Sequence, residues 1–554
     1  MTIKQQIERD LGFPITASSQ QGIDYQCNAC FALAKQQGKK PLDVAMEVAK
    51  NFKSKIATIT AVPPAFLNIV VRDEALLKID KIMLEPQKQR TVFFDYGCAN
   101  IAKELHAGHL RSPIIGEALR RVHNAFGHKT LGCTYLGDWG LQIGLVIAQS
   151  QDEGIIKNGK FTKQITLDML NDIYPKASKR KSTDQEFKKR AEDITLDMQN
   201  LKEPYISLWR EIRRVSVDKI RESYDRLNCT FDFYNGESNA EPYVDVVLKM
   251  LSDKGLTYID KDCVMMDVKT DTDTAPMPPV ILKKGNGGDL YATSDVATAY
   301  YRYKNHKPNE IIYVSDFRQD LHFKQFFRIV KNGGLVPPET QLTFVGYGTM
   351  MGADGKPFKT RSGESIRLAE ILQMVTDAAS KRLTENGRGG DLVLAEKIGL
   401  SALKFADLSN NVRRDYIFEI DKFTSFEGKT GPYILYTIAR INSIFEKANI
   451  KNNGFARLTP TRDYVKLNEI REIYVAILRL SDSYPVALQN YTLNGIVDAV
   501  YELAKAFNLF YANTNILKEP DPNKRAFYLH VCSLVKGALE FAMKTLAIDT
   551  VDKM

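Results

Sequence analysis

The sequence predicts an α/β protein built from three parts. A small α/β domain comes first, a parallel-sheet domain with a helical insertion follows, and an all-α bundle ends the chain. Three observations carry this prediction. Short β-branched and aromatic runs alternate with helical patterns up to about residue 365. Between about 150 and 245 that alternation gives way to helical, highly charged sequence. After about 365 only long amphipathic helical patterns remain.

Length, charge and cysteine content indicate an ordinary globular protein. The 554 residues carry a formal net charge of +9, which permits a polyanionic partner but does not require one. No apolar stretch approaches the roughly 18 residues of a membrane span, and the polar start lacks the apolar core of a secretory signal. Seven cysteines are few and odd in number, as expected of free thiols in a reducing compartment. We therefore expect a cytoplasmic protein with no membrane partner.

One cysteine pair needs separate interpretation. Cys27 and Cys30 form a C-x-x-C pair, but no second pair or histidine group lies near them in the sequence to complete a zinc site. We expect two small, partly buried residues.

The first predicted domain spans residues 1–88. A helical pattern runs over 42–52, and two strand patterns, 56–62 and 66–71, are separated by a Pro-Pro pair. The polar stretch 85–90 then predicts a linker.

The second predicted domain spans residues 89–425. Its opening order of strand, glycine-containing loop, helix and strand is typical of a Rossmann-type parallel sheet. A charged helical insertion from about 150 to 245 separates the two halves of this sheet, and we expect its basic run at 176–181 to be a solvated surface. The predicted strands are 92–96, 129–136, 311–314 and 342–345, and the first helix is 110–126.

The third predicted domain spans residues 426–554 and is helical. Apolar residues recur at helical spacing in a series of long segments, which predicts a bundle. Counted from the end of the sheet, the predicted helices are 366–387, 391–409, 431–448, 463–482, 493–512 and 524–546.

His106-Ala107-Gly108-His109 is the first motif that carries chemistry. It lies where a predicted strand passes into a helix. A helix N-terminus offers free backbone N–H groups to a phosphate, and two imidazoles add donors for charge that builds on a phosphate under attack. Gly108 lets the backbone approach closely. The alternative is two histidines that cap a helix by chance. The motif predicts an ATP site with His106, Gly108 and His109 as contacts.

The surrounding residues resemble a known family in several ordered motifs. The segment 100–112 resembles the first motif of the arginyl-tRNA synthetases, a class I family. Gly137-Asp138-Trp139-Gly140-Leu141-Gln142, Tyr291-Ala292-Thr293-Ser294-Asp295 and Gln319-Asp320-Leu321-His322 match further family motifs in order. The segment 354–363 is similar to the second ATP loop, and 431–441 is similar to the start of the family's anticodon-binding domain.

The resemblance implies that the chain activates arginine with ATP and transfers it to tRNA(Arg), with release of AMP and pyrophosphate. Mg²⁺ would accompany the nucleotide rather than occupy a protein site. The family typically activates arginine only when tRNA is bound. The implied arginine contacts are Asp95, Asn100, Tyr291, Asp295 and Gln319. The implied domain roles are tRNA contact for 1–88, catalysis for 89–425 and anticodon binding for 426–554.

The second ATP loop departs from the usual class I pattern, because it reads Phe358-Lys359-Thr360-Arg361-Ser362. Family members that lack the usual lysine are thought to use a lysine just upstream of the histidine motif. That residue is Lys103 here. We expect Lys103 and Lys359 to share the neutralisation of phosphate charge, with assistance from Arg361.

Two arginine contacts have structural alternatives that the residues alone leave open. Asp295 could cap the helical-looking segment that follows it, and Tyr291 could be a core residue. If a helix starts here, residues four apart face the same way. A site that hydrogen-bonds a buried polar substrate rejects apolar competitors ~10⁴-fold or more, so we expect no editing domain.

In the third domain, Arg440, Asn508 and Tyr511 are the predicted tRNA contacts, because unpaired bases are read by stacking and by hydrogen bonds to base edges. The alternative for the aromatic residues is core packing. Alternatives for the whole chain are another class I synthetase, a nucleotidyltransferase, or a non-catalytic tRNA-binding paralogue. We expect a monomer.

Overall fold

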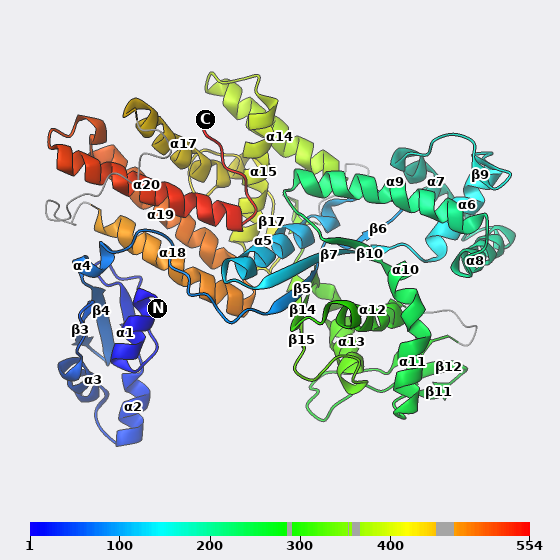
Figure 1. The fold of residues 1–554 in the computed structure, drawn as a ribbon, viewed down its shortest axis with the longest axis horizontal. Helices are drawn as coiled ribbons and strands as arrows, with labels where there is room; N and C mark the ends of the chain where they lie inside the picture. The colour runs from blue at the N-terminus through cyan, green and yellow to red at the C-terminus, as the bar shows by residue number, and fades with distance from the viewer. Residues whose placement is uncertain (285–290, 353, 357–365, 450–469) are drawn as a thin grey trace. The chain divides into compact units, whose positions relative to one another are not determined.

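A computed structural model describes the chain except residues 285–290, 353, 357–365 and 450–469, together with the side chain of Tyr291. The chain forms two compact units (Figure 1). One unit contains Met1–Gln87, Thr376–Ser409 and Asp421–Met554, and the other contains Lys88–Val375 and Asn410–Ile420.

The N-terminal part of the first unit is a four-stranded antiparallel sheet with helices. The sheet has the order β1-β2-β4-β3. Its last two strands are the pair predicted on either side of the Pro-Pro sequence, which confirms them. Cys27 and Cys30 are fully buried rather than partly buried. The elements are α1 (Ile3–Leu11), β1 (Thr16–Ala17), β2 (Tyr25–Cys27), α2 (Cys30–Gln37), α3 (Pro41–Asn51), β3 (Ala57–Val62), β4 (Phe66–Val71) and α4 (Asp73–Leu76).

The C-terminal part of the first unit is a helical bundle, and it includes residues 392–409, which lie before the predicted domain boundary at residue 425. Its helices are α15 (Leu392–Ser409), α16 (Ile420–Phe423), α17 (Gly431–Lys447), α18 (Arg471–Asn490), α19 (Asn494–Asn513) and α20 (Pro522–Thr545), and α14 (Leu368–Glu385) leads into it. The prediction for α18 was wrong in its end: the helix continues through Pro485 to Asn490, where Tyr491 caps it in the left-handed conformation. Helix α20 is long and apolar enough to cross a membrane by composition, but 61% of that stretch is buried among the other helices. It therefore reads as a core helix.

Helix α18 also holds the N-terminal sheet through buried polar contacts. Arg471 donates from Nη2 to the Asp24 carboxylate at 2.8 Å and to the Val71 carbonyl at 2.8 Å. Tyr25 donates its hydroxyl to Asp482 at 2.5 Å. Asp24 is only 4% exposed, and the Arg471 guanidinium is its counter-charge.

We expect Arg471→Ala to lower the free energy of unfolding of this unit by roughly 3 kcal/mol, because removing one partner leaves a buried carboxylate without its counter-charge. Thermal unfolding followed by circular dichroism measures the change. Arg471→Lys restores part of the loss, and Lys505→Ala, which breaks an exposed pair with Glu502, is the matched control. Equal stability of Arg471→Ala and Lys505→Ala would contradict the role given to this contact.

The second unit is built on a parallel sheet with the order β10-β7-β5-β14-β15, and β6 adds to β7. All of its pairings are parallel, which confirms the Rossmann-type prediction. The chain runs outward from β5 in both directions, so the order reverses between β5 and β14. The strands are β5 (Thr91–Asp95), β6 (Ala99–Asn100), β7 (Lys129–Gly137), β10 (Phe233–Gly236), β14 (Glu310–Asp316) and β15 (Gln341–Tyr347), and α5 (Arg111–Ala125) follows β6.

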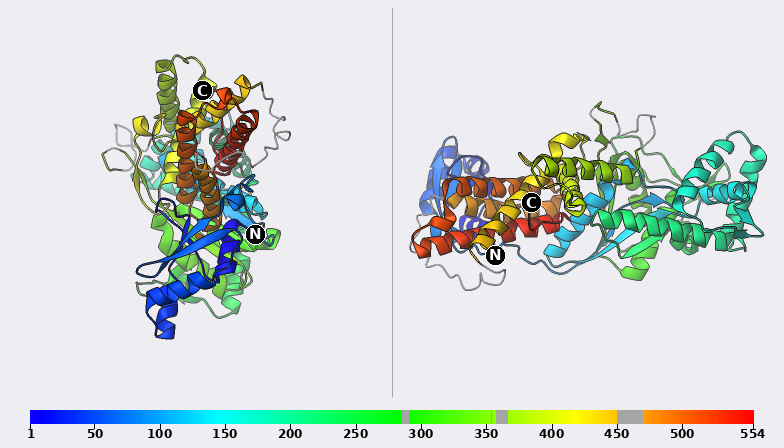
Figure 2. Two further views of the ribbon diagram at one scale, coloured as in Figure 1. Left: turned by 90° about the vertical axis from the view of Figure 1, so that its left-hand side faces the viewer. Right: turned by 90° about the horizontal axis from the view of Figure 1, so that it is seen from above.

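The predicted insertion is helical. Helices α6 (Leu141–Asp152), α7 (Leu167–Arg180), α8 (Gln185–Gln199) and α9 (Tyr205–Arg226) pack on one another, with a small hairpin of β8 (Ile156–Lys157) and β9 (Lys160–Phe161) (Figure 2). Its basic run is solvated: Lys176 is exposed, and Arg180 pairs with Asp152 and Asp184. The helical pattern ends at Arg226, and Phe233–Gly236 join the main sheet as its edge strand.

The remaining elements of the second unit cover the sheet and extend it. Helix α12 (Tyr291–His306) and helix α13 (Asp320–Asn332) share a buried core with β5 and β14. The other elements are α10 (Glu237–Ala240), α11 (Val244–Asp253), β11 (Tyr258–Asp260), β12 (Cys263–Met266), β13 (Val280–Lys283), β16 (Met350–Met351) and β17 (Tyr416–Ile417). The pairing of β16 with β17 is a short strand contact after residue 365, where the sequence predicts helices alone.

Candidate active site

The predicted site residues gather at the carboxyl edge of the parallel sheet. Parallel strands end at the same edge, and ligands bind there at the point where the strand order reverses. Asp95 ends β5, Asn100 ends β6, Gly137 ends β7, and Gln319 follows β14 after a short turn. Asn100 and Gln319 are both exposed at this edge.

Asn100 is held by a close approach to the next strand. A Cβ atom on Gly137 would lie 2.1 Å from the Asn100 Oδ1 atom, so no side chain fits there. The glycine that opens the Gly137-Asp138-Trp139-Gly140 motif thus makes room for the Asn100 amide.

The two motif histidines are fixed as hydrogen-bond donors. His106 Nδ1 accepts from the Gly108 N–H at 3.1 Å, and His109 Nδ1 accepts from the His106 N–H at 3.0 Å. A backbone N–H can only donate, so each Nδ1 is unprotonated and each Nε2 carries the hydrogen. A Cβ atom on Gly108 would lie 2.9 Å from the His106 ring. Glycine at this position therefore leaves room for the ring to accept the Gly108 N–H.

Both imidazoles are neutral near pH 7. Burial lowers the pKa of His109 to about 3, and His106 and Lys103 act in the same direction. Desolvation by the surrounding protein, together with the Lys103 ammonium, also lowers the pKa of His106. The motif therefore presents two neutral Nε2–H donors beside one lysine cation.

The backbone N–H groups of the motif, which were predicted to be free for a phosphate, are all hydrogen-bonded within the protein. His106 N donates to His109 Nδ1, and Gly108 N donates to His106 Nδ1. Ala107 N donates to the Ile366 carbonyl, and His109 N donates to the His106 carbonyl. The backbone N–H groups stabilise the turn, and the Nε2–H groups of the two imidazoles are the donors left for a ligand.

The segment after the second predicted ATP loop is tied to the histidine motif. Ala107 N donates to the Ile366 carbonyl at 2.9 Å, and Leu368 N donates to the Leu105 carbonyl at 2.8 Å. Residues 357–365, with the predicted Lys359 and Arg361, lie outside the described part of the chain. Ile366, which directly follows that range, is hydrogen-bonded to the turn that carries His106.

Asp295 lies in the second turn of α12 and is held by His322. His322 Nε2 and Asp295 Oδ2 are 2.7 Å apart, and the ionised carboxylate can only accept. Because α12 begins at Tyr291, Asp295 lies inside the helix and is not its N-cap. The histidine of the Gln319-Asp320-Leu321-His322 motif thus orients a carboxylate. Tyr291 starts the same helix four residues earlier.

Asp95 has a partner that the sequence analysis missed. The Arg302 guanidinium, 1% exposed, lies 2.7 Å from Asp95 Oδ2 and is surrounded by the rings of Phe93, Tyr135 and Tyr313. Asp95 Oδ1 is buried and makes no hydrogen bond to any residue that the structure describes. Burial raises the pKa of Asp95 against the pull of Arg302, and the nearby Asp295 adds to the rise.

Glu237 is a further carboxylate that the sequence analysis missed. It directly follows β10, at the same edge of the sheet, and its Oε2 accepts from Trp139 N at 3.3 Å. Burial raises its pKa to about 7, and the Asp138 and Asp295 carboxylates push it in the same direction. The sequence signal for Glu237 is its place directly after the aromatic strand β10, within the segment that is predicted to be the insertion.

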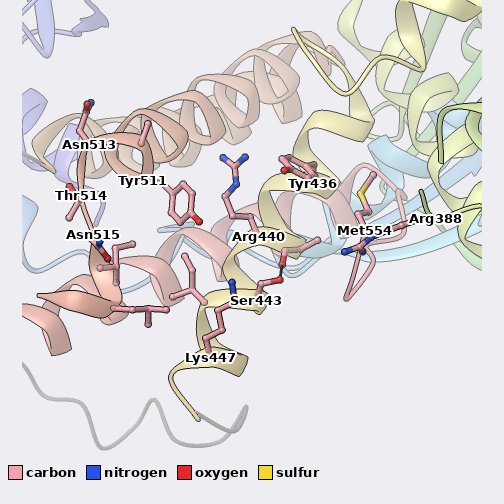
Figure 3. Close-up of a pocket in the computed structure, with 15 residues that line it drawn as sticks. Arg388, Tyr436, Arg440, Ser443, Lys447, Tyr511, Asn513, Thr514, Asn515 and Met554 are labelled. Carbon is pink, nitrogen blue, oxygen red and sulfur yellow. Dashed lines mark hydrogen bonds between the residues drawn. The ribbon is translucent and has the colours of Figure 1, made fainter. Parts of the chain in front are cut away.

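A second site lies in the helical bundle. A cavity of about 680 Å³ is lined by residues of α17 and α19, the segment after α19 and the terminal Met554 (Figure 3). The Arg440 guanidinium lies 4.7 Å from the ring centre of Tyr436 and 4.8 Å from that of Tyr511. Arg440 also donates to Asn508. Arg440 and Tyr511, two of the three predicted tRNA contacts, line this cavity, and Asn508 is hydrogen-bonded to Arg440. Phe507 and Phe510 are buried, as the core alternative predicts.

Three family models match consecutive parts of the chain. The N-terminal domain of arginyl tRNA synthetase matches residues 3–71, the class I (R) tRNA synthetase catalytic domain matches 72–420, and the DALR anticodon binding domain matches 434–554.

Relatives and solved structures agree with these models. An arginine–tRNA ligase of Alkaliphilus oremlandii is 38% identical, covering 96% of this chain and 94% of its own. One from Francisella tularensis is 32% identical, over 98% and 95%. The arginyl-tRNA synthetase structure from Plasmodium falciparum superposes with a TM-score of 0.82 at 25% identity, over 99% and 97%. The Thermus thermophilus structure, at 21% identity and a TM-score of 0.83, shares the fold over 100% and 99%.

Proposed function

The chain belongs to the arginyl-tRNA synthetases, and we propose how its residues activate arginine with ATP and charge tRNA. The observation that carries the proposal is the pair of fixed, neutral Nε2–H donors beside Lys103, at the sheet edge that also holds Asp95, Asn100 and Asp295. Charging assays with tRNA(Arg) and each of the twenty amino acids test it. Arginine alone should become attached, and attachment of another amino acid would contradict it.

The first step needs stabilisation of charge rather than a protein nucleophile. The arginine carboxylate attacks the α-phosphorus of ATP, a bond to the leaving pyrophosphate breaks, and arginyl-adenylate forms. His106 and His109 donate to the phosphate oxygens, where preorganised donors stabilise the transition state. Lys103, with Lys359 and Arg361, offsets the charge of the pyrophosphate.

In the second step a terminal ribose hydroxyl of tRNA attacks the carbonyl carbon of the adenylate, and AMP leaves. Asn100 and Gln319 hold the α-amino end of arginine at the exposed sheet edge. The Asp295 carboxylate and the Asp95 Oδ1 atom accept hydrogen bonds from the guanidinium, and Tyr291, whose side chain lies outside the described part of the chain, is a further proposed contact. A planar cation with five donors requires fixed acceptors, and His322 and Arg302 fix two of these carboxylates.

Mg²⁺ supplies charge neutralisation on the triphosphate. Within the described ranges no three histidine, cysteine or acidic side chains cluster closely enough to hold a metal ion. We propose that the ion accompanies ATP and is not held by a site of its own in the protein. We also propose a monomer that works in the cytoplasm.

We propose that Glu237, a further carboxylate at the sheet edge near Asp295, also contacts the guanidinium, which gives arginine binding a pH dependence. Its pKa of about 7 means that the carboxylate is ionised above pH 7 and protonated below it. Since a guanidinium binds the ionised form, kcat/KM for arginine should fall roughly tenfold between pH 8 and pH 6. Initial rates of ATP–pyrophosphate exchange at limiting arginine measure this.

Glu237→Gln is the control for that profile. It should lower kcat/KM for arginine at pH 8 and flatten the profile, because the lowered pKa values of His106 and His109 leave those residues neutral over this range. A profile that keeps its slope in Glu237→Gln would contradict the assignment.

The bundle cavity is proposed as a site for unpaired anticodon bases. Stacking of a base on aromatic or guanidinium planes contributes ~1–3 kcal/mol. We expect Arg440→Met to raise the Kd for tRNA(Arg) about tenfold while the KM for ATP stays unchanged. Filter binding measures the Kd. Arg525→Met removes an exposed charge from the same bundle and is the matched control; an equal loss there would show a non-specific charge effect.

A further inference from the structure

The segment 102–104, directly before the histidine motif, is hydrogen-bonded to two helices of the insertion. Ala102 has a positive φ of 59°, and its N–H donates at 2.9 Å to Ser216 Oγ, a fully buried group on α9. Glu104 N donates at 2.8 Å to Asn171 Oδ1 on α7. Lys103 lies between these two anchors. Two helices of the insertion therefore set the course of the backbone that carries Lys103.

Helix α7, which accepts the Glu104 N–H, also contacts the Lys103 side chain. The Lys103 Nζ atom lies 4.2 Å from the centre of the Tyr174 ring. Tyr174 and Asn171 are three residues apart on α7, so they lie on one face of that helix. One anchors the backbone next to the lysine, and the other receives the ammonium.

The held ammonium acts on the histidines from this position. The Lys103 charge lowers the pKa values of both His106 and His109. The contact with Tyr174 therefore leaves the Lys103 ammonium close enough to affect the pKa values of His106 and His109. On the other side, Glu104 pairs at 3.1 Å with Arg367, which follows the second ATP loop.

We propose that Tyr174 is a positioning residue for the activation of arginine with ATP. We also propose that helices α7 and α9 of the insertion fix the backbone segment that carries Lys103. The inference rests on the proposed role of Lys103 in phosphate neutralisation. A lysine side chain is flexible, and a contact with an aromatic face restricts it before the nucleotide arrives. Little rearrangement is then needed as negative charge develops on the leaving pyrophosphate.

The test compares Tyr174→Leu with Tyr174→Phe, which keeps the ring face. Rates of ATP–pyrophosphate exchange at saturating arginine and tRNA give kcat and the KM for ATP. Tyr174→Leu should lower kcat about three- to tenfold with less than a twofold change in KM, and Tyr174→Phe should retain nearly full kcat. Tyr243→Leu is the matched control, since it removes a half-buried ring that carries Lys304 at 5.2 Å.

The double variant assigns the effect to Lys103. In a Lys103→Ala background, Tyr174→Leu should cause no further loss. A loss that persists there, or an equal loss in Tyr174→Phe, would show that Tyr174 only supports the fold. Normal kcat in Tyr174→Leu with an impaired Lys103→Ala would overturn this inference alone. Normal kcat in Lys103→Ala would instead overturn the role of Lys103 and the inference with it.

Discussion

His109→Ala should lower kcat for arginine activation by about 10²- to 10³-fold, the range measured when one preorganised donor to a developing charge is removed. The fixed tautomer makes this donor specific, because His109 Nδ1 accepts the His106 N–H and only Nε2 can point at the nucleotide. The KM for ATP should rise far less than kcat falls, since the donor matters most when charge builds in the transition state. ATP–pyrophosphate exchange gives both quantities.

A glutamine at this position separates donor loss from structural damage. The amide of His109→Gln can place an N–H near the position of Nε2, so it should recover part of the lost rate. His530→Ala, on α20 in the other unit, is the control and should stay within about twofold of the parent enzyme. If His109→Ala kept more than a tenth of the parent kcat, the imidazole would not be the donor that this mechanism requires.

Asp295→Asn should lower kcat/KM for arginine by about 10²- to 10³-fold. Loss of one partner from a buried, hydrogen-bonded charge pair costs about 2–5 kcal/mol, much of it from the charge left unpaired. Here the charge left unpaired is the guanidinium of the substrate. The KM for ATP should change little, because Asp295 lies with Asp95 and Glu237 rather than with the histidines. Steady-state exchange at varied arginine measures the effect.

Two further variants serve as comparisons for the loss of kcat/KM in Asp295→Asn. His322→Asn should cause a smaller loss, since it removes the donor that orients Asp295 and leaves the charge in place. Asp273→Asn breaks an ion pair with Arg328 in the same unit and is the matched control. A decrease in Asp295→Asn no larger than in Asp273→Asn would remove Asp295 from the arginine site.

The fold could be predicted where local sequence decides it. The parallel strands β5, β7, β14 and β15 and the helices of the bundle show clear periodicity, and the structure confirms them. Strand β10 was missed because it is four residues long and follows a charged helical stretch. Its strand conformation depends on pairing with β7, a contact distant in sequence.

The site could be predicted as far as motifs identify single residues. His106, His109, Asp95, Asn100, Asp295 and Gln319 all lie at the carboxyl edge of the sheet or in the motif that follows it. Their partners could not be predicted. Arg302 reaches Asp95 from α12, and Tyr174 reaches Lys103 from the insertion, through tertiary contacts that no spacing in the sequence encodes. The hydrogen bonds from the His106 and Gly108 N–H groups to the imidazoles could not be predicted either, because they depend on where the two rings lie.

We propose that this chain forms arginyl-adenylate at the sheet edge that carries His106 and His109. Arginine-dependent exchange of pyrophosphate into ATP, measured with and without tRNA(Arg), tests it most directly. We expect exchange with arginine that requires tRNA(Arg) and that His109→Ala lowers by about 10²- to 10³-fold. Exchange supported by a different amino acid, or no exchange with arginine in the presence of tRNA(Arg), would contradict it.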